Sequence, residues 1–371
     1  MSTVWIAADG VVSPLGRTTD ATYQKIRNGK TGIREINDRA LLPIPFFAGK
    51  MEDSDIGDSP GLSRFEKICW EAMRQATLGI ALAPERTLFI LSTTKGNISF
   101  LEQGRSTDPR LALHATSRYL ASMAGIRDQM VVSNACVSGV MAMIVAKRFL
   151  ESGKYDHALV VGADVLSQFV VSGFNCLQAI SPLPCKPFDR KRSGVNLGEA
   201  AAAVILTTKP EQLGVTPFIK IVGGGLSNDA NHISGPSRTG EELGNAISQA
   251  LSEAHLETDN VDFISAHGTA TRYNDEMEAK AFIGLGLNHT LTNSMKGYFG
   301  HTLGAAGVLE TIMSAKSLQH NEVIATYGCE EPDNPPINVC LKPEKRMVNT
   351  CLKTASGFGG CNAAIILQKV N

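Results

Sequence analysis

Uninterrupted apolar runs, rather than alternating ones, are the clearest pattern along this chain. Residues 88–92 and 158–162 are short continuous apolar runs, which are typical of strands buried on both faces of a sheet. Residues 140–149 and 305–318 are apolar around most of a helical circumference. A helix of that kind has to lie between layers, because a surface helix keeps a polar face toward water. The pattern predicts an α/β protein whose buried helices are enclosed by sheets.

Two features of the chain recur at nearly the same offset. Residues 193–206 and 356–367 are both Gly-rich turns that enter an apolar strand, and their final leucines are 161 positions apart. Cys136 and His301 each precede a buried helix and are 165 positions apart. Such a repeat predicts two similar halves packed together. The other explanation is a chance similarity between two Gly-rich and apolar stretches of sequence.

We place the join between the halves near residues 209–214. This assigns residues 1–210 to an N-terminal half that carries Cys136 and residues 211–371 to a C-terminal half. We expect no true linker at the join. The candidate chemistry falls in both halves, so the two should be tightly packed as one unit.

Composition and charge exclude several classes of function. The 371 residues are 43% hydrophobic and 19% charged, with a net charge of −1, which gives no reason to expect binding to nucleic acid or to an anionic membrane surface. No apolar run reaches the length of about 18 residues that a membrane span requires. The eight cysteines include no C-x-x-C pair, which argues against a zinc site and a disulfide framework. Residues 1–6 resemble a first strand more than a signal peptide, so we expect a cytoplasmic protein.

Cys136 is a candidate nucleophile. It lies in a turn of small residues, 133–139, that opens directly into an apolar helix. The N-terminus of a helix carries partial positive charge and unpaired backbone N–H groups, which stabilise a thiolate and any oxyanion formed beside it. For an isolated cysteine, a buried core position is the commoner interpretation.

Two histidine-containing loops favour the catalytic interpretation of Cys136. His267 follows an apolar strand and precedes a glycine and hydroxyl residues, and His301 lies in a loop that leads into a buried helix. Loops just past a strand are where α/β enzymes usually carry their chemistry. Either histidine alone would more often be structural. A thiol to be acylated and two imidazoles to donate to a developing oxyanion are together the parts of thioester chemistry.

The chain resembles the β-ketoacyl-[acyl-carrier-protein] synthases, the condensing enzymes of the thiolase-like superfamily. Four motifs occur in the expected order: the Cys136 turn and residues 266–271, 296–301 and 356–362. The resemblance runs through nearly the whole chain. It implies a thiolase-like α/β fold of five layers, α-β-α-β-α, built from two pseudo-symmetric halves.

The resemblance also implies roles for particular residues. Cys136 corresponds to the family nucleophile, and His267 and His301 to the two catalytic histidines that assist loss of CO₂ and stabilise oxyanions. Lys296 corresponds to a buried catalytic lysine and Glu310 to its acidic neighbour, and we expect the two to form a charge pair that orients the site.

Two aromatic residues gain roles in the same way. Phe358 corresponds to the gating phenylalanine of a glycine-rich loop. The resemblance implies that the backbone N–H groups of Phe358 and Cys136 together form the oxyanion hole. Phe174 corresponds to an aromatic residue that lines the acyl pocket, with a plain core position as the alternative.

Asp275 is expected to cap the helix after the His267 loop.

The implied activity is a decarboxylative Claisen condensation between an acyl thioester, held on Cys136, and malonyl-[acyl-carrier protein]. No metal or organic cofactor is implied, because the phosphopantetheine arm belongs to the carrier protein. The expected partners are the acyl carrier protein, malonyl and acyl thioesters, and a second subunit in a homodimer or in a heterodimer with a related chain. Because carrier proteins are acidic, we expect a basic rim where the carrier would dock, and the candidates are Arg64, Lys67 and Arg74. Ordinary solvated surface charge explains each of these residues as well.

Departures from the family pattern point toward a specialised condensing enzyme of polyene or other secondary lipids. They are Val137, Gly297, Ser356, Gln178 and an apparent shortening between Gly96 and Met130. A catalytically silent subunit of the chain-length-factor type stays open as an alternative, although such subunits usually lack the nucleophile. A degradative thiolase is disfavoured, because Cys361 does not lie in a Cys-x-Gly setting. Nucleotide-binding and G-x-S-x-G hydrolase motifs are absent from the sequence.

Overall fold

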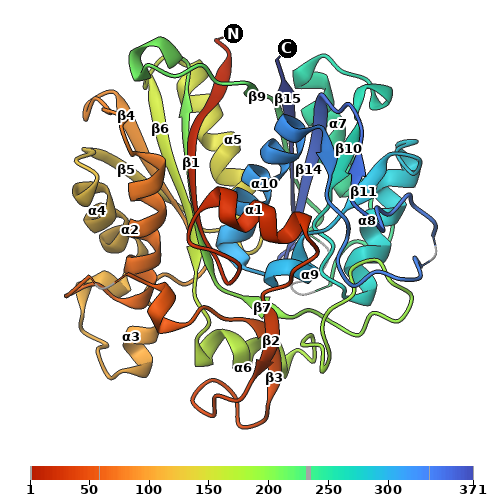
Figure 1. The fold of residues 1–371 in the computed structure, drawn as a ribbon, viewed down its shortest axis with the longest axis horizontal. Coiled ribbons are helices and arrows are strands. Elements are labelled where there is room, and N and C mark those ends of the chain that lie inside the picture. Colours follow the sequence, from red (N-terminus) through yellow and green to blue (C-terminus); the bar gives the residue numbers. More distant parts are fainter. Residues whose placement is uncertain (1, 58, 231–234, 334, 371) are drawn as a thin grey trace.

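Two mixed sheets enclose a pair of central helices in the computed structural model, which describes residues 2–57, 59–230, 235–333 and 335–370 (Figure 1). The central helices are α5 (Ser138–Glu151) and α10 (Ala306–His320). Outer helices cover the far faces of the sheets: α2 (Arg64–Ala76) and α4 (Leu113–Met123) on one side, and α7 (Glu241–Ala254) and α8 (Arg272–Gly284) on the other. This arrangement confirms the predicted five layers.

The two sheets have the same strand order. The N-terminal sheet runs β5-β4-β6-β8-β1 and the C-terminal sheet β11-β10-β14-β15-β9. In each, the first three strands are parallel and the last two pairings are antiparallel. The strands are β1 (Val4–Val12), β4 (Thr87–Ser92), β5 (Asp128–Val132), β6 (His157–Asp164), β8 (Ala200–Thr207), β9 (Ile219–Asn228), β10 (Phe263–Ser265), β11 (Leu291–Asn293), β14 (Thr350–Gly357) and β15 (Cys361–Lys369). The shared order confirms the two pseudo-symmetric halves.

The sheets meet where β1 pairs with β9. Val4, Trp5 and Ile6 pair antiparallel with Ile219, Lys220 and Ile221, so the ten strands form one continuous hydrogen-bonded array. A short 3₁₀ turn, Pro210–Leu213, leads from β8 to β9. The assignment of residues 1–210 and 211–371 as the two halves stays a prediction.

The central helices cross at two glycines. A Cβ added to Gly307 would lie 2.3 Å from the backbone nitrogen of Val140, and one added to Gly139 would lie 2.8 Å from the Cα of Gly307. Backbone therefore packs directly on backbone at this point. The predicted helices were correct in position, although α5 begins at Ser138, two residues earlier than the apolar pattern indicated. This close crossing places the N-terminal ends of α5 and α10 side by side.

Smaller elements complete the fold. The remaining helices are α1 (Thr19–Arg27), α3 (Ser99–Glu102), α6 (Gln168–Cys176) and α9 (Lys296–Phe299), and the short strands are β2 (Ile33–Ile36), β3 (Phe46–Gly49), β7 (Leu197–Gly198), β12 (Glu322–Val323) and β13 (Glu344–Lys345). In the described part of the chain, every helix is too short or too polar to cross a bilayer.

Candidate active site

Cys136 lies in the tight turn between β5 and α5. Ala135, immediately before it, has a left-handed backbone with φ of 43°. The hydroxyl of Ser138 donates to the Ala135 carbonyl at 2.6 Å and accepts from the Asn134 N–H at 2.8 Å. A larger side chain at Ala135 would worsen the steric cost of positive φ, which explains the small residues that the sequence shows here.

The structure brings both predicted histidines to Cys136. The cysteine sulfur and one ring nitrogen of each of His267 and His301 all lie within 4.8 Å of one another. The two imidazole rings meet edge to face, with centroids 5.1 Å apart and an interplanar angle of 83°. His267 follows β10, and His301 lies between α9 and α10. Three residues from three separate loops therefore form one cluster.

The Cys136 thiol is protonated at neutral pH, contrary to the thiolate that the helix N-terminus suggested. Burial raises the pKa of the thiol to about 11, although the Lys296 ammonium and a hydrogen bond from the Phe358 backbone N–H act in the opposite direction. The sequence reveals where the helix starts but not how completely the sulfur is removed from water. Any nucleophilic reaction of this sulfur would therefore require removal of its proton.

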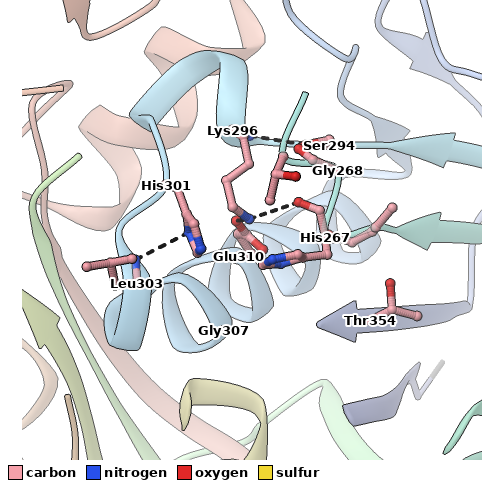
Figure 2. Close-up of polar contacts among 12 residues, drawn as sticks. His267, Gly268, Ser294, Lys296, His301, Leu303, Gly307, Glu310 and Thr354 are labelled. Atoms are coloured by element: carbon pink, nitrogen blue, oxygen red, sulfur yellow. Dashed lines mark hydrogen bonds and ion pairs between the residues drawn. The ribbon is translucent and has the colours of Figure 1, made fainter. Parts of the chain in front are cut away.

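Both imidazoles are neutral. Burial, followed by the charge of Lys296, lowers the pKa of His267 and of His301 well below 6.5. The backbone N–H of Leu303 donates to Nδ1 of His301 at 3.3 Å (Figure 2). The neutral ring therefore carries its hydrogen on Nε2. That atom is buried and has no partner among the described residues, which leaves a donor free for an incoming oxygen.

The predicted charge pair between Lys296 and Glu310 is present. The Lys296 ammonium, which is fully buried, contacts Oε1 of Glu310 and donates to the backbone carbonyl of His267 at 3.0 Å (Figure 2). Burial alone would raise the pKa of Glu310, but Lys296 and a second lysine, Lys353, hold it below its ordinary value. The pair thus connects α9 and α10 to the loop that carries His267.

A second buried carboxylate fixes the His267 loop. Glu278, on α8, accepts from the backbone N–H of His267 at 2.8 Å and from that of Gly268 at 2.6 Å. It also accepts from the Thr354 hydroxyl on β14 at 3.0 Å. Successive backbone donors that converge on one carboxylate hold a loop rigidly, because each of these charge-assisted bonds is strong.

Asp275 does not cap α8, contrary to the sequence prediction. It lies in the first turn of the helix, and Thr271 is the N-cap residue. The Asp275 carboxylate instead accepts from the backbone N–H groups of Thr269 at 2.9 Å and Phe188 at 2.7 Å. Its role is structural, as predicted, but it ties two loops together rather than satisfying the helix end.

A pocket of about 520 Å³ leads to the cluster, lined by Cys136, both histidines, Phe174 and Phe358 among others. The Phe174 and Phe358 rings pack against each other, with centroids 5.5 Å apart. Phe358 lies on the turn between β14 and β15, in which Gly359 and Gly360 have positive φ. Both aromatic residues therefore line the pocket that opens onto Cys136.

Cysteine and two histidines are also a ligand set that zinc accepts. Here the fully buried ammonium groups of Lys296 and Lys353 share the interior behind the imidazoles and lower the pKa of both rings. The same positive charges would repel a divalent cation. We therefore interpret the cluster as a nucleophile with hydrogen-bond donors.

Family models match most of the chain. The model for the β-ketoacyl synthase N-terminal domain matches residues 65–212, and that for the β-ketoacyl synthase C-terminal domain matches residues 218–330. The chain belongs to the β-ketoacyl synthase family. This β-ketoacyl synthase family member is 26% identical to 3-oxoacyl-[acyl-carrier-protein] synthase 2 of Staphylococcus aureus, over 99% of this chain and 98% of the relative. It is 32% identical to nodulation protein E of Rhizobium leguminosarum bv. trifolii, over 71% of this chain and 67% of the relative.

Solved structures of ketosynthases share the whole fold of this β-ketoacyl synthase family member. A ketosynthase solved with its chain length factor from Xenorhabdus doucetiae has a TM-score of 0.88 and 27% identity, covering 100% of this chain and 98% of that one. The ishigamide ketosynthase/chain length factor has a TM-score of 0.90 and 26% identity, covering both chains completely. The fold is therefore thiolase-like, as the sequence predicted.

Sequence reasoning missed Lys353. Its ammonium lies 2.7 Å from Oε2 of Glu310 and is as deeply buried as that of Lys296. A signal was available, because Lys353 is the one charged residue in the stretch 350–357, which otherwise consists of apolar, small and hydroxyl residues. A lysine in such a strand needs a buried partner. In this member of the β-ketoacyl synthase family the partner is the carboxylate already assigned to Lys296.

Proposed function

We propose that this protein catalyses a decarboxylative Claisen condensation: an acyl thioester, malonyl-[acyl-carrier protein] and a proton give a β-ketoacyl-[acyl-carrier protein], CO₂ and the free thiol of the acyl donor. The observation that carries the proposal is the meeting of the Cys136 thiol with two neutral imidazoles at a pocket. Family membership supports a ketosynthase reaction, and the two histidines supply the donors that its charged intermediates require.

The first half-reaction transfers the acyl chain to Cys136. The sulfur attacks the thioester carbonyl and loses its proton, which a neutral imidazole can accept and pass to the departing carrier thiolate. The tetrahedral oxyanion is stabilised by the backbone N–H groups of Cys136 and Phe358. The Phe358 N–H already bonds to the sulfur in the free protein, so it is in place beforehand. The products are the acyl-enzyme and the free carrier thiol.

The second half-reaction forms the carbon–carbon bond. Malonyl thioester loses CO₂, and the electron pair of the broken bond becomes an enolate on the thioester oxygen. The unpartnered Nε2–H of His301 is a donor for that oxygen, with His267 beside it. The enolate carbon attacks the acyl carbonyl, and the Cys136 thiolate leaves and takes up a proton from water. Removing one such donor typically costs about 10²–10³ in rate.

The carrier protein is the proposed source of both thioesters, and its phosphopantetheine arm is the only prosthetic group that the reaction needs. The arm is long and thin, which suits a pocket that reaches a buried thiol. The exposed Arg272 at this pocket suits an acidic carrier. Two of the three candidate rim residues are less suitable, because Arg64 is paired with Glu199 at 2.5 Å and Arg74 with Glu71 at 2.9 Å.

We further propose that the protein works in fatty acid synthesis or in specialised polyene or polyketide-type lipid synthesis, as a homodimer or as a heterodimer with a related subunit. The two ketosynthase and chain-length-factor structures described above support a paired subunit. They also make a silent chain-length-factor-like role the alternative. The intact Cys136, His267 and His301 cluster opposes that alternative.

Intact mass spectrometry tests the proposal. The protein is incubated with acyl-carrier-protein thioesters of varied chain length, beside Cys136→Ala and Cys176→Ala. Cys176 is an exposed thiol and serves as the matched control. We expect a single acyl mass gain on the wild type and on Cys176→Ala but not on Cys136→Ala. The absence of a gain from any donor, on a folded protein, would instead support the silent-subunit role.

A further inference from the structure

Lys353 shares one buried carboxylate with Lys296. Glu310 contacts Lys296 through Oε1 and Lys353 through Oε2, the latter at 2.7 Å, and both lysine side chains are fully buried. One carboxylate between two ammonium groups leaves an excess of positive charge at this point. A second buried cation is costly unless an opposite charge and hydrogen bonds compensate it.

The Lys353 ammonium also bonds to the backbone that leads into His267. It donates to the carbonyls of Ser265 at 3.2 Å and Ala266 at 3.3 Å, and to that of Thr354 at 2.7 Å. Lys296 donates to the next carbonyl along, that of His267 itself. The two lysines therefore hold three consecutive carbonyls at the end of β10.

Lys353 connects the separate parts of the site. It lies on β14, five residues before Phe358, and pairs across the sheet with Ser265 of β10. Through Glu310 it reaches α10, the helix that follows His301. The charged groups that surround the two imidazoles are Lys296 on α9, Lys353 on β14, Glu310 on α10 and Glu278 on α8, with the Cys136 thiol at the start of α5.

We propose that Lys353 is a positioning residue of this site: it fixes the backbone that carries His267 and places a second positive charge behind both imidazoles. The inference rests on the proposed condensation and identifies a further residue that supports it. The positive charge keeps both imidazole rings neutral at pH values where an ordinary imidazole would be protonated. A neutral ring has one nitrogen that donates a hydrogen bond and one that accepts. The positive charge also favours the enolate, which is negative. Consistent with this, Lys353 lowers the pKa of both His267 and His301.

Lys353→Met tests the proposal, with Lys147→Met as the matched control. Lys147 is also a buried lysine held by two glutamates, Glu151 and Glu253, but it lies toward the far end of α5 from Cys136. Removing Lys353 leaves the neutral Lys296–Glu310 pair, so the variant should fold. We expect it to keep acylation of Cys136 and to lose about 10²-fold in decarboxylation of malonyl-[acyl-carrier protein]. Loss should be greatest at acid pH, because the imidazole pKa rises toward 6.5 and the rings become protonated.

Nitrogen NMR of the histidine rings gives a readout that is independent of turnover. In the wild type and in Lys147→Met, the rings of His267 and His301 should stay neutral as the pH falls through 6.5, and in Lys353→Met their titration should move upward. Wild-type rings that titrate near 6.5 would overturn the inference without any variant. So would a Lys353→Met protein whose ring titration and decarboxylation match those of Lys147→Met. A wild type that neither acylates nor decarboxylates would show that the proposed condensation itself is wrong.

Discussion

At the scale of single residues, the protonation state of Cys136 has the widest consequences. Helix N-termini normally favour thiolates, yet here burial dominates and raises the thiol pKa to about 11. The cysteine is therefore unreactive toward general electrophiles at neutral pH. In the proposed reaction, its reactivity depends on a substrate that brings a carbonyl to the backbone donors and on an imidazole that takes the proton.

Alkylation of Cys136 by iodoacetamide should show this directly. The labelling rate should increase about tenfold per pH unit between about pH 8 and pH 10, because the thiolate fraction is still increasing there. Peptide mass spectrometry would follow Cys136 separately from the exposed Cys176. A rate that levels off below about pH 9 would mean that the thiol is far more acidic than its burial dictates.

His301→Ala should separate the two half-reactions. The variant removes the unpartnered Nε2–H donor but leaves the Cys136 turn and the Phe358 N–H in place. We expect the acyl-enzyme to form while condensation falls by about 10²–10³. Stopped assays of acyl-enzyme mass and β-ketoacyl product would measure both. Equal loss of both steps would assign His301 to acyl transfer as well.

At the scale of elements, the crossing of α5 and α10 determines the geometry of the site. The helices touch backbone to backbone at Gly139 and Gly307. Cys136 lies two residues before the start of α5, and Glu310 lies in the first turns of α10. The separation of the helices therefore fixes the separation of Cys136 from the Lys296–Glu310 pair.

Gly307→Ala should destabilise the protein and impair acyl transfer together. The new Cβ would lie 2.3 Å from the Val140 nitrogen, so the helices must separate. Overpacking of this kind typically costs about 1–3 kcal/mol. Guanidinium unfolding would give the loss of stability. Gly284→Ala in α8 is the control, because its Cβ would meet nothing within 4 Å.

The sequence predicted these elements well and their electrostatics poorly. Continuous apolar runs identified α5, α10, β4 and β6 because burial on every side removes the polar residues that mark a surface. The motifs identified Cys136 and both histidines. The second cation on Glu310 and the protonated thiol were missed, because both depend on which groups the fold brings together and how deeply it buries them.

At the scale of the whole molecule, the two halves share one core. Buried residues of both central helices and of the sheet faces that contact them form a single apolar cluster, so either half alone would expose its side of this cluster. Separately expressed residues 1–210 and 211–371 should be insoluble or unfolded alone, and co-expression should recover folded protein. Solubility and circular dichroism of each half would show whether it folds alone. A half that is soluble and folded by itself would contradict the prediction that the halves depend on a shared core.

The pairing of β1 and β15 with β9 has a practical consequence for circular permutation of the protein. Val4 of β1 and Leu367 of β15 both pair with Ile221 of β9, so residues at the two ends of the sequence lie about 10 Å apart. They lie at the end of the sheets opposite Cys136, because β1 runs in the same direction as β5, and the cysteine follows the C-terminal end of β5. A short peptide bridge could therefore make a circular permutant, with new termini opened in an exposed loop, without disturbing the chemistry.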